Sequence, residues 1–95
     1  MVEINMRFAV RDFDAFWEGF RERGTALRER HGSQGARVLR SLDDPNGVTV
    51  ELRFGSRQDF DGFMQDPEVQ NSMVKGGVRG IPDIVVLDPV GETQA

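Results

Sequence analysis

Residues 36–56 constrain the fold most strongly, because they combine two strand-like runs with a turn typical of antiparallel neighbours. The turn is predicted at Asp43-Asp44-Pro45-Asn46-Gly47, where proline presets one backbone angle and Asn-Gly tolerates the positive φ of tight hairpins. Beyond it, apolar and polar side chains alternate: Val48, Val50, Leu52 and Phe54 against Thr49, Glu51 and Arg53. One face of this strand is therefore apolar. An isolated hairpin is marginal in water, so other segments must cover that face.

The remaining segments complete a familiar order of elements. Residues 2–10 alternate like another half-buried strand, and residues 13–30 carry apolar side chains at helical spacing. A second helical region covers 56–75, and residues 84–87 predict the last strand, bounded by prolines. The order βαββαβ predicts an α+β, ferredoxin-like domain over 1–90. It has a four-stranded antiparallel sheet with the helices on one face. Residues 91–95 are expected to form a loose tail.

Local signals mark the ends of the predicted helices. Asp12 and Ser56 stand where N-cap side chains are favoured. Asp66-Pro67 restarts a helical turn, with proline at its preferred first position. Gly24 lies inside the first helical pattern and predicts a bend or a weak point there.

Composition excludes several classes of site and partner. The 95 residues contain no cysteine and one histidine, so disulfides, thiolate sites and cysteine nucleophiles are absent, and we expect no metal site. No apolar run approaches the ~20 residues of a transmembrane helix, and the N-terminus does not resemble a secretory signal. We therefore expect a cytoplasmic protein that has no membrane partner.

The net charge of −4 argues against nucleic acid as a partner, because such proteins usually carry a basic footprint. Four arginines do gather on the first helix, but glutamates are interleaved with them: Arg21, Arg23, Arg28 and Arg30 among Glu18, Glu22 and Glu29. We favour a solvated face of mixed charge over an anion-binding patch.

The stretch from Glu51 to Met73 resembles the strand-to-helix signature of the dimeric α/β-barrel superfamily. Its matching features are an acidic residue, an aromatic residue, a serine, an acidic-aromatic pair and an Asp-Pro step: Glu51, Phe54, Ser56, Asp59-Phe60 and Asp66-Pro67. Antibiotic-biosynthesis monooxygenases, haem-degrading monooxygenases and polyketide-cyclase-like proteins belong to this superfamily. Asp12-Phe13-Asp14, Trp17 and the loop 77–82 resemble its cyclase-like members.

The resemblance implies two protomers whose sheets meet in a barrel, with a small-molecule pocket between the helices and the sheet of each protomer. Met73 stands where haem-degrading members place an iron-ligating histidine, and Phe54 stands in place of their strand tryptophan. We therefore expect neither haem nor another cofactor. Members that work without a cofactor use Asn and Trp near the substrate, and Asn5 and Trp17 are of those types.

Candidate site residues carry alternative structural interpretations. His31 follows an arginine-rich helix end, where the helix dipole favours a cation. We prefer this structural role for His31 over a role in proton transfer. Asn5 and Arg7 share one strand face. A polar network at the dimer interface is preferred there over a catalytic role, in which Asn5 would donate to an oxyanion and Arg7 would hold an anion. Trp17, Phe54 and Met73 are expected to line the pocket if one is present, although core packing is the preferred interpretation of Trp17.

The leading functional hypothesis is a homodimer that binds an aromatic or polyketide-like compound, and its extension is conversion of that compound by oxygenation or cyclisation. It requires a cavity near ~300 Å³ between helices and sheet. The alternative is a non-catalytic, ligand-binding or stress-related dimer, which the single histidine and the absence of tyrosine favour. A transcription-related regulatory domain is less favoured, because no DNA-binding segment is recognisable.

Overall fold

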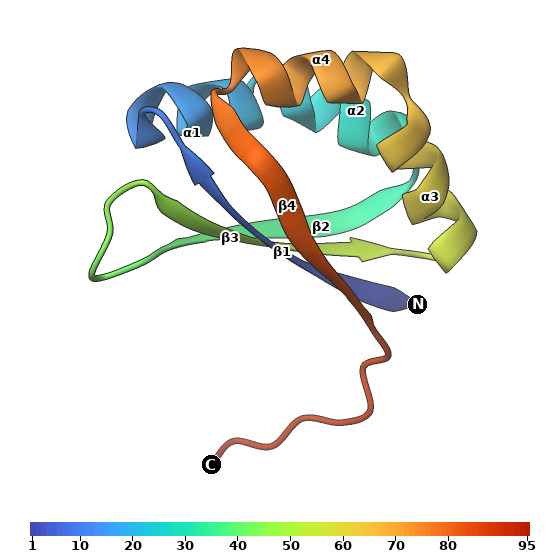
Figure 1. Cartoon of the computed structure of the whole chain (residues 1–95). Helices are drawn as coiled ribbons and strands as arrows, with labels where there is room; N and C mark the ends of the chain where they lie inside the picture. Colours follow the sequence, from blue (N-terminus) through green and yellow to red (C-terminus); the bar gives the residue numbers. More distant parts are fainter.

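Four antiparallel strands form a sheet whose order is β2-β3-β1-β4, with helices on one face only (Figure 1). The computed structural model describes residues 1–95. Its elements are β1 (Val2–Val10), α1 (Phe13–Arg21), α2 (Arg23–Arg30), β2 (Ser33–Arg40), β3 (Gly47–Phe54), α3 (Arg57–Gln65), α4 (Pro67–Lys75) and β4 (Val78–Leu87). The predicted ferredoxin-like arrangement is confirmed, with each helical region divided into two helices. Residues 88–95 contain no helix or strand and lead away from the sheet.

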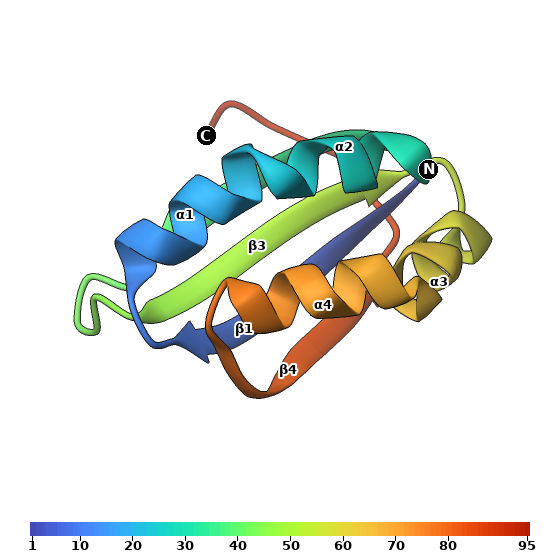
Figure 2. The same ribbon diagram turned by 90° about the horizontal axis from the view of Figure 1, so that it is seen from above.

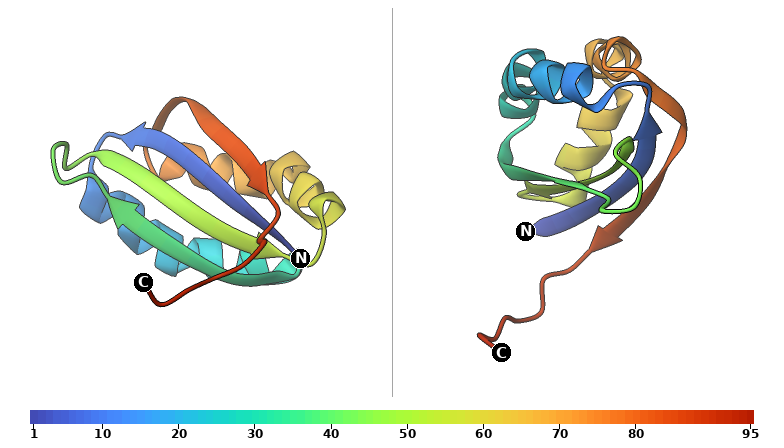
Figure 3. Two further views of the ribbon diagram at one scale, coloured as in Figure 1. Left: turned by 90° about the horizontal axis from the view of Figure 1, so that it is seen from below. Right: turned by 90° about the vertical axis from the view of Figure 1, so that its left-hand side faces the viewer.

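The core lies between the helices and the central strands. Antiparallel pairing places Ile4 opposite Leu52 and Met6 opposite Val50, so the apolar rows of β1 and β3 share one face. The helices cover this face, as the view from above shows (Figure 2). Twelve apolar side chains are buried there: Ile4, Met6, Val10, Phe16, Leu27, Val48, Val50, Leu52, Phe54, Phe60, Phe63 and Val69. The opposite face of the sheet has no covering layer (Figure 3).

The helix caps follow the sequence signals. Asp12 accepts a hydrogen bond from the backbone N–H of Asp14, and Ser56 accepts one from Asp59. Asp66 caps α4 in the same way. The first helical region breaks at Glu22, two residues before the glycine predicted to weaken it. The N-terminus of α2 consequently has no side-chain cap.

The hairpin turn differs from the prediction. No residue other than glycine has positive φ, and Gly47 is not among the positive-φ glycines. The reversal instead centres on Pro45 and Asn46, with the N–H of Gly47 donating to the carbonyl of Asp44 at 3.0 Å. Asn46 also has a tertiary role, because its side-chain oxygen accepts a hydrogen bond from the N–H of Phe13 at 3.2 Å. This hydrogen bond to the start of α1, together with the one that the backbone N–H of Val10 donates to the carbonyl of Asn46, thus outweighs the local preference of Asn-Gly.

The last strand is longer than predicted. β4 begins at Val78 and includes residues 78–82 of the loop predicted at 77–82, Pro82 among them. Proline is tolerated because β4 is an edge strand, and the β1–β4 register shifts between Arg7 and Ala9, opposite this segment.

Phe54 provides a test of the core. Its side chain is 0% exposed and packs against the rings of Phe60 and Phe63. We expect Phe54→Ala to lower the free energy of unfolding by about 3–5 kcal/mol, because truncation leaves a cavity. Urea denaturation measures this change. Gln58→Ala, at an exposed position of α3, should change stability by less than about 0.5 kcal/mol. Equal effects of the two substitutions would contradict this description of the core.

Candidate functional site

An apolar cavity of about 70 Å³ lies between the helices and the sheet. Strands β1 and β3 form its floor, while α1, α2 and α4 form most of its walls. Figure 2 shows these helices lying over the two strands. Eleven of the seventeen lining residues are hydrophobic, among them Met6, Phe16, Phe20, Val50, Leu52 and Met73. The cavity is smaller than the ~300 Å³ that the leading hypothesis requires, because large side chains fill most of the space between the layers, so the cavity by itself does not meet that requirement.

Aromatic packing shapes one wall of the cavity. Phe16 and Phe20 are one helical turn apart on α1, with ring centroids separated by 5.7 Å. Phe8 of β1 meets Phe16 edge to face at 5.5 Å. Across the cavity, Gly76 at the end of α4 approaches the ring of Phe16, since a Cβ added there would lie 3.6 Å from Cδ1. The apolar stripe predicted on the first helix thus lines the cavity as well as the core.

Two arginines of α2 supply the only charged side chains in the lining. The Arg28 guanidinium lies 3.8 Å from the Phe20 ring centroid, and its Nη2 donates to the carbonyl of Phe20 and to the hydroxyl of Thr25, both at 3.1 Å. Burial lowers the pKa of Arg28, an effect that nearby Glu29 opposes. Arg23 lies five residues earlier and is exposed.

Two glycines give these guanidinium groups their positions. A Cβ at Gly24 would lie 2.6 Å from Nη1 of Arg28, and a Cβ at Gly19 would clash with Nη2 of Arg23. Each arginine therefore lies back across a glycine four residues earlier. Glycine inside a helix costs about 1 kcal/mol of stability relative to alanine, so each of these two glycines destabilises its own helix.

A second, more polar space of about 320 Å³, the groove, lies between α2 and α4 and adjoins the cavity. Arg23, Leu27 and Ser72 line both spaces. The groove also contains three further charged side chains, Arg30, Glu68 and Lys75. The combined space is apolar at its inner end and predominantly cationic at its outer end.

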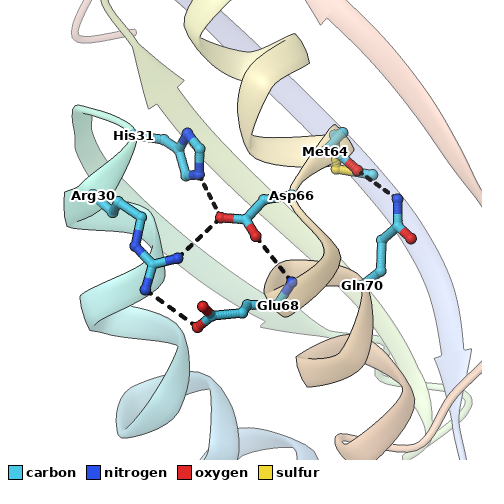
Figure 4. A network of polar contacts seen from close by, with 6 residues as sticks. All are labelled: Arg30, His31, Met64, Asp66, Glu68 and Gln70. Carbon is cyan, nitrogen blue, oxygen red and sulfur yellow. Dashed lines mark hydrogen bonds and ion pairs between the residues drawn. The ribbon is translucent and has the colours of Figure 1, made fainter.

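A polar network joins the end of α2 to the start of α4 (Figure 4). His31 is the C-cap of α2, and its Nε2 donates to Oδ2 of Asp66 at 2.8 Å, since an ionised carboxylate only accepts. Arg30 donates to Asp66 and to Glu68, both at 3.2 Å. The hydrogen bond from His31, followed by the one from the backbone N–H of Glu68 and by the charge and hydrogen bond of Arg30, lowers the pKa of Asp66. His31 also meets the ring of Phe63 edge to face and does not line the cavity.

Only one of the three residues predicted to line the pocket does so. Met73 lies in the cavity wall. Trp17 is on the outer side of α1, 38% exposed, where it stacks on Phe20 with Arg21 over its ring. Phe54 is fully buried and packs against α3, away from the cavity.

The three candidate catalytic residues are not brought together. Asn5 and Arg7 alternate along β1 with Ile4 and Met6, whose side chains are in the core under the helices, so Asn5 and Arg7 lie on the opposite, uncovered face of the sheet. His31 lies on the helical side of the molecule. For Asn5 and Arg7, the uncovered face is the location expected if they form a polar network at a dimer interface.

The cavity supplies apolar surface for binding and two guanidinium groups that can stabilise an anion. No Asp, Glu or His lines it, and Arg is not deprotonated at physiological pH. No group of three or more His, Cys, Asp or Glu side chains could hold a metal ion. No helix is long and apolar enough to span a membrane.

Sequence reasoning did not identify Arg28 and Arg23 as cavity residues. They were assigned with two other arginines to one solvated face, but the four separate in space: Arg21 stacks on Trp17 and Arg30 pairs with Asp66 and Glu68. The signal that distinguishes the cavity pair is Gly-x₃-Arg, which occurs twice within one helical region, at 19–23 and 24–28.

Solved structures share this fold at low sequence identity. SnoaB, a cofactor-independent oxygenase from Streptomyces nogalater, is 18% identical, with a TM-score of 0.75, covering 98% of this chain and 95% of that one. A Bordetella bronchiseptica protein designated an antibiotic biosynthesis monooxygenase is 15% identical, with a TM-score of 0.79 and coverage of 94% and 96%. Rv0793 from Mycobacterium tuberculosis is 19% identical, with a TM-score of 0.64 and 98% coverage of both chains.

No family model and no curated protein sequence matches the chain. The similarity therefore establishes the fold, which is the one expected from the resemblance to antibiotic-biosynthesis monooxygenases.

The Asp66 network predicts a pH dependence of stability. Because folding lowers the pKa of Asp66, its contribution is complete above the usual pKa of about 3.9 and is lost as pH falls through the lower folded value. Asp66→Asn keeps a capping side chain but loses the charge. We expect it to be less stable than the native protein at pH 7, with the difference shrinking below about pH 4.

Urea denaturation across this pH range measures the difference. Asp61→Asn, at an exposed position of α3 with no side-chain partner, is the matched control and should follow the native profile. A constant difference between native protein and Asp66→Asn down to the lowest pH would refute the role of the charge.

Proposed function

We propose that this protein binds a small aromatic or polyketide-like molecule between α1–α2, α4 and the sheet. The observation that carries the proposal is the apolar cavity that continues into a larger, cation-lined groove. An apolar end lined by Phe16, Phe20 and Met73 suits planar hydrophobic groups. Few polar groups interrupt it, so the site favours a ligand with one apolar part and one polar part.

The ligand-free cavity must enlarge to accept such a molecule. Its volume of about 70 Å³ corresponds to roughly two or three water molecules at ~30 Å³ each. Met6 and Met73 are unbranched and repack more readily than β-branched residues. The adjoining groove supplies about 320 Å³ for the remainder of the ligand.

Conversion of the ligand without a cofactor is a second candidate function, favoured by the structural similarity to SnoaB, a cofactor-independent oxygenase. Such an oxygenation balances when a substrate CH₂ becomes C=O and the second oxygen atom of O₂ leaves as water. Arg28 would stabilise the substrate anion that reacts with O₂. The absence of a carboxylate or histidine from the lining favours the non-catalytic alternative, because no side chain there can remove the proton.

Methionine methyl groups provide a direct test of binding. Met6 and Met73 line the cavity, whereas Met1 and Met64 do not. In protein labelled with ¹³C at the methionine methyls, we expect 1-naphthol to shift the Met6 and Met73 signals saturably, because its ring enters between them. The signals of Met1 and Met64 are the internal controls. If only those two move, or none does, the proposed cavity is not a binding site for aromatic molecules.

We also propose that two copies pair through the uncovered face of the sheet. Charges on that face alternate: Glu3 is opposite Arg53, and Arg7 is opposite Asp83. Arg37 and Glu51 form an ion pair at 2.7 Å. Three large apolar side chains, Leu39, Val85 and Leu87, are 41–47% exposed among them. A mixed face of this kind supports pairing with a copy of itself, since isologous contact can match each charge with its opposite.

Light scattering tests the assembly. The native protein should have twice the chain mass of 10.7 kDa. Leu87→Asp should shift it toward the monomer, because pairing would bury an unpaired carboxylate. Val74→Asp places the same charge on exposed α4 and should leave the mass unchanged. A native monomer, or dissociation by both variants alike, would refute pairing through the sheet.

A further inference from the structure

We propose that the ligand carries an oxyanion, either a carboxylate or an ionised phenol or enol, and that Arg28 and Arg23 bind it at the mouth of the cavity. The inference deepens the proposed function and rests on it. It identifies the chemical class of the polar end of the ligand, which an apolar cavity alone leaves open.

Arg28 is a partly buried cation that forms no ion pair, although the charge of nearby Glu29 acts on it. Every other arginine of the chain is exposed, and only Arg30 and Arg37 form ion pairs. The partners of the Arg28 guanidinium are neutral: a backbone carbonyl, a hydroxyl and the ring of Phe20. Charges removed from water are usually paired, so an anion from the ligand would offset the desolvation of this side chain.

The arrangement around Arg28 selects for an anion rather than a cation. No carboxylate lines the cavity, although the protein as a whole is acidic, with 16 acidic and 12 basic residues. Arg23 lines the cavity and the groove alike, and Lys75 adds a further positive charge to the groove. A planar guanidinium also matches the geometry of two oxygens on one group.

Two glycines leave room for the guanidinium groups of both arginines. Gly19 and Gly24 leave the space that the guanidinium groups of Arg23 and Arg28 fill, and both glycines line the cavity. Alanine at position 24 would favour the helix by about 1 kcal/mol but would displace the end of Arg28. Gly24→Ala therefore moves the cation without removing it or weakening the helix.

Two ligands of matched shape test the proposal: 2-naphthoate, which is anionic, and 2-naphthamide, which is neutral. Shifts of the Met6 and Met73 methyl signals report binding of each. We expect the native protein to bind the naphthoate about tenfold more tightly than the amide, as charge-assisted hydrogen bonds predict. The preference should weaken with rising ionic strength, because added salt screens the attraction.

Variants assign the preference to particular residues. Arg28→Gln should remove most of the preference while leaving the amide affinity within about twofold, and Arg28→Lys should retain part of it. Gly24→Ala should reduce it while keeping or raising the melting temperature, which separates the effect from loss of fold. Arg21→Gln, on the outer side of α1, is the matched control and should retain the full preference.

An ionisable phenol distinguishes the two kinds of oxyanion. If the site holds phenolates, the ionisation midpoint of bound 2-naphthol, followed by absorbance, should fall below that of free 2-naphthol. A carboxylate preference without this fall assigns the site to carboxylates, and the fall alone assigns it to phenols or enols.

Equal affinities for naphthoate and naphthamide, together with an unchanged 2-naphthol midpoint, would overturn the inference and leave the proposed function standing. The same applies if Arg21→Gln abolishes the preference as fully as Arg28→Gln does. If neither naphthalene ligand shifts Met6 or Met73, both proposals are wrong.

Discussion

The structure depends on the burial of one apolar sheet face by helices that are individually too short to be stable. Helices of eight or nine residues are marginal in isolation, so their stability comes from packing on β1 and β3. The same requirement places every helix on one side and leaves the other face of the sheet open. The cavity and the proposed dimer face are therefore on opposite sides of one sheet, and substitutions on one face can be made without altering the side chains of the other.

The fold could be predicted because its signals are local and periodic. Alternation in β1 and β3 identified the buried face, and Asp12, Ser56 and Asp66 marked the helix starts through side-chain caps. The predictions were wrong where tertiary contacts, and not local sequence, determine the backbone conformation. Asn46 accepts a hydrogen bond from the start of α1 and does not adopt positive φ. Pro82 is tolerated in β4 because that strand lies at an edge of the sheet.

The candidate site was less predictable, because periodicity gives the face of a residue but not its neighbours. Phe54 is on the correct face of β3, yet it lies at the strand end under α3. Trp17 follows cavity-lining Phe16 by one position, which turns it about 100° around the helix to the outer side. Arg28 was hidden among charges of both signs, and its distinguishing property, partial burial without an ion pair, exists only in three dimensions.

The division of the first helical region at Glu22 has a consequence for how the cavity can change its volume. The end of α2 nearest this break lacks a side-chain cap, whereas its other end is held to α4 through His31 and Asp66. Fraying of α2 is thus favoured beside Arg23 and disfavoured at His31. Disordering of this one helical turn would widen the cavity beside Arg23, while the other end of α2 stays bonded to Asp66 and the core under α3 stays packed.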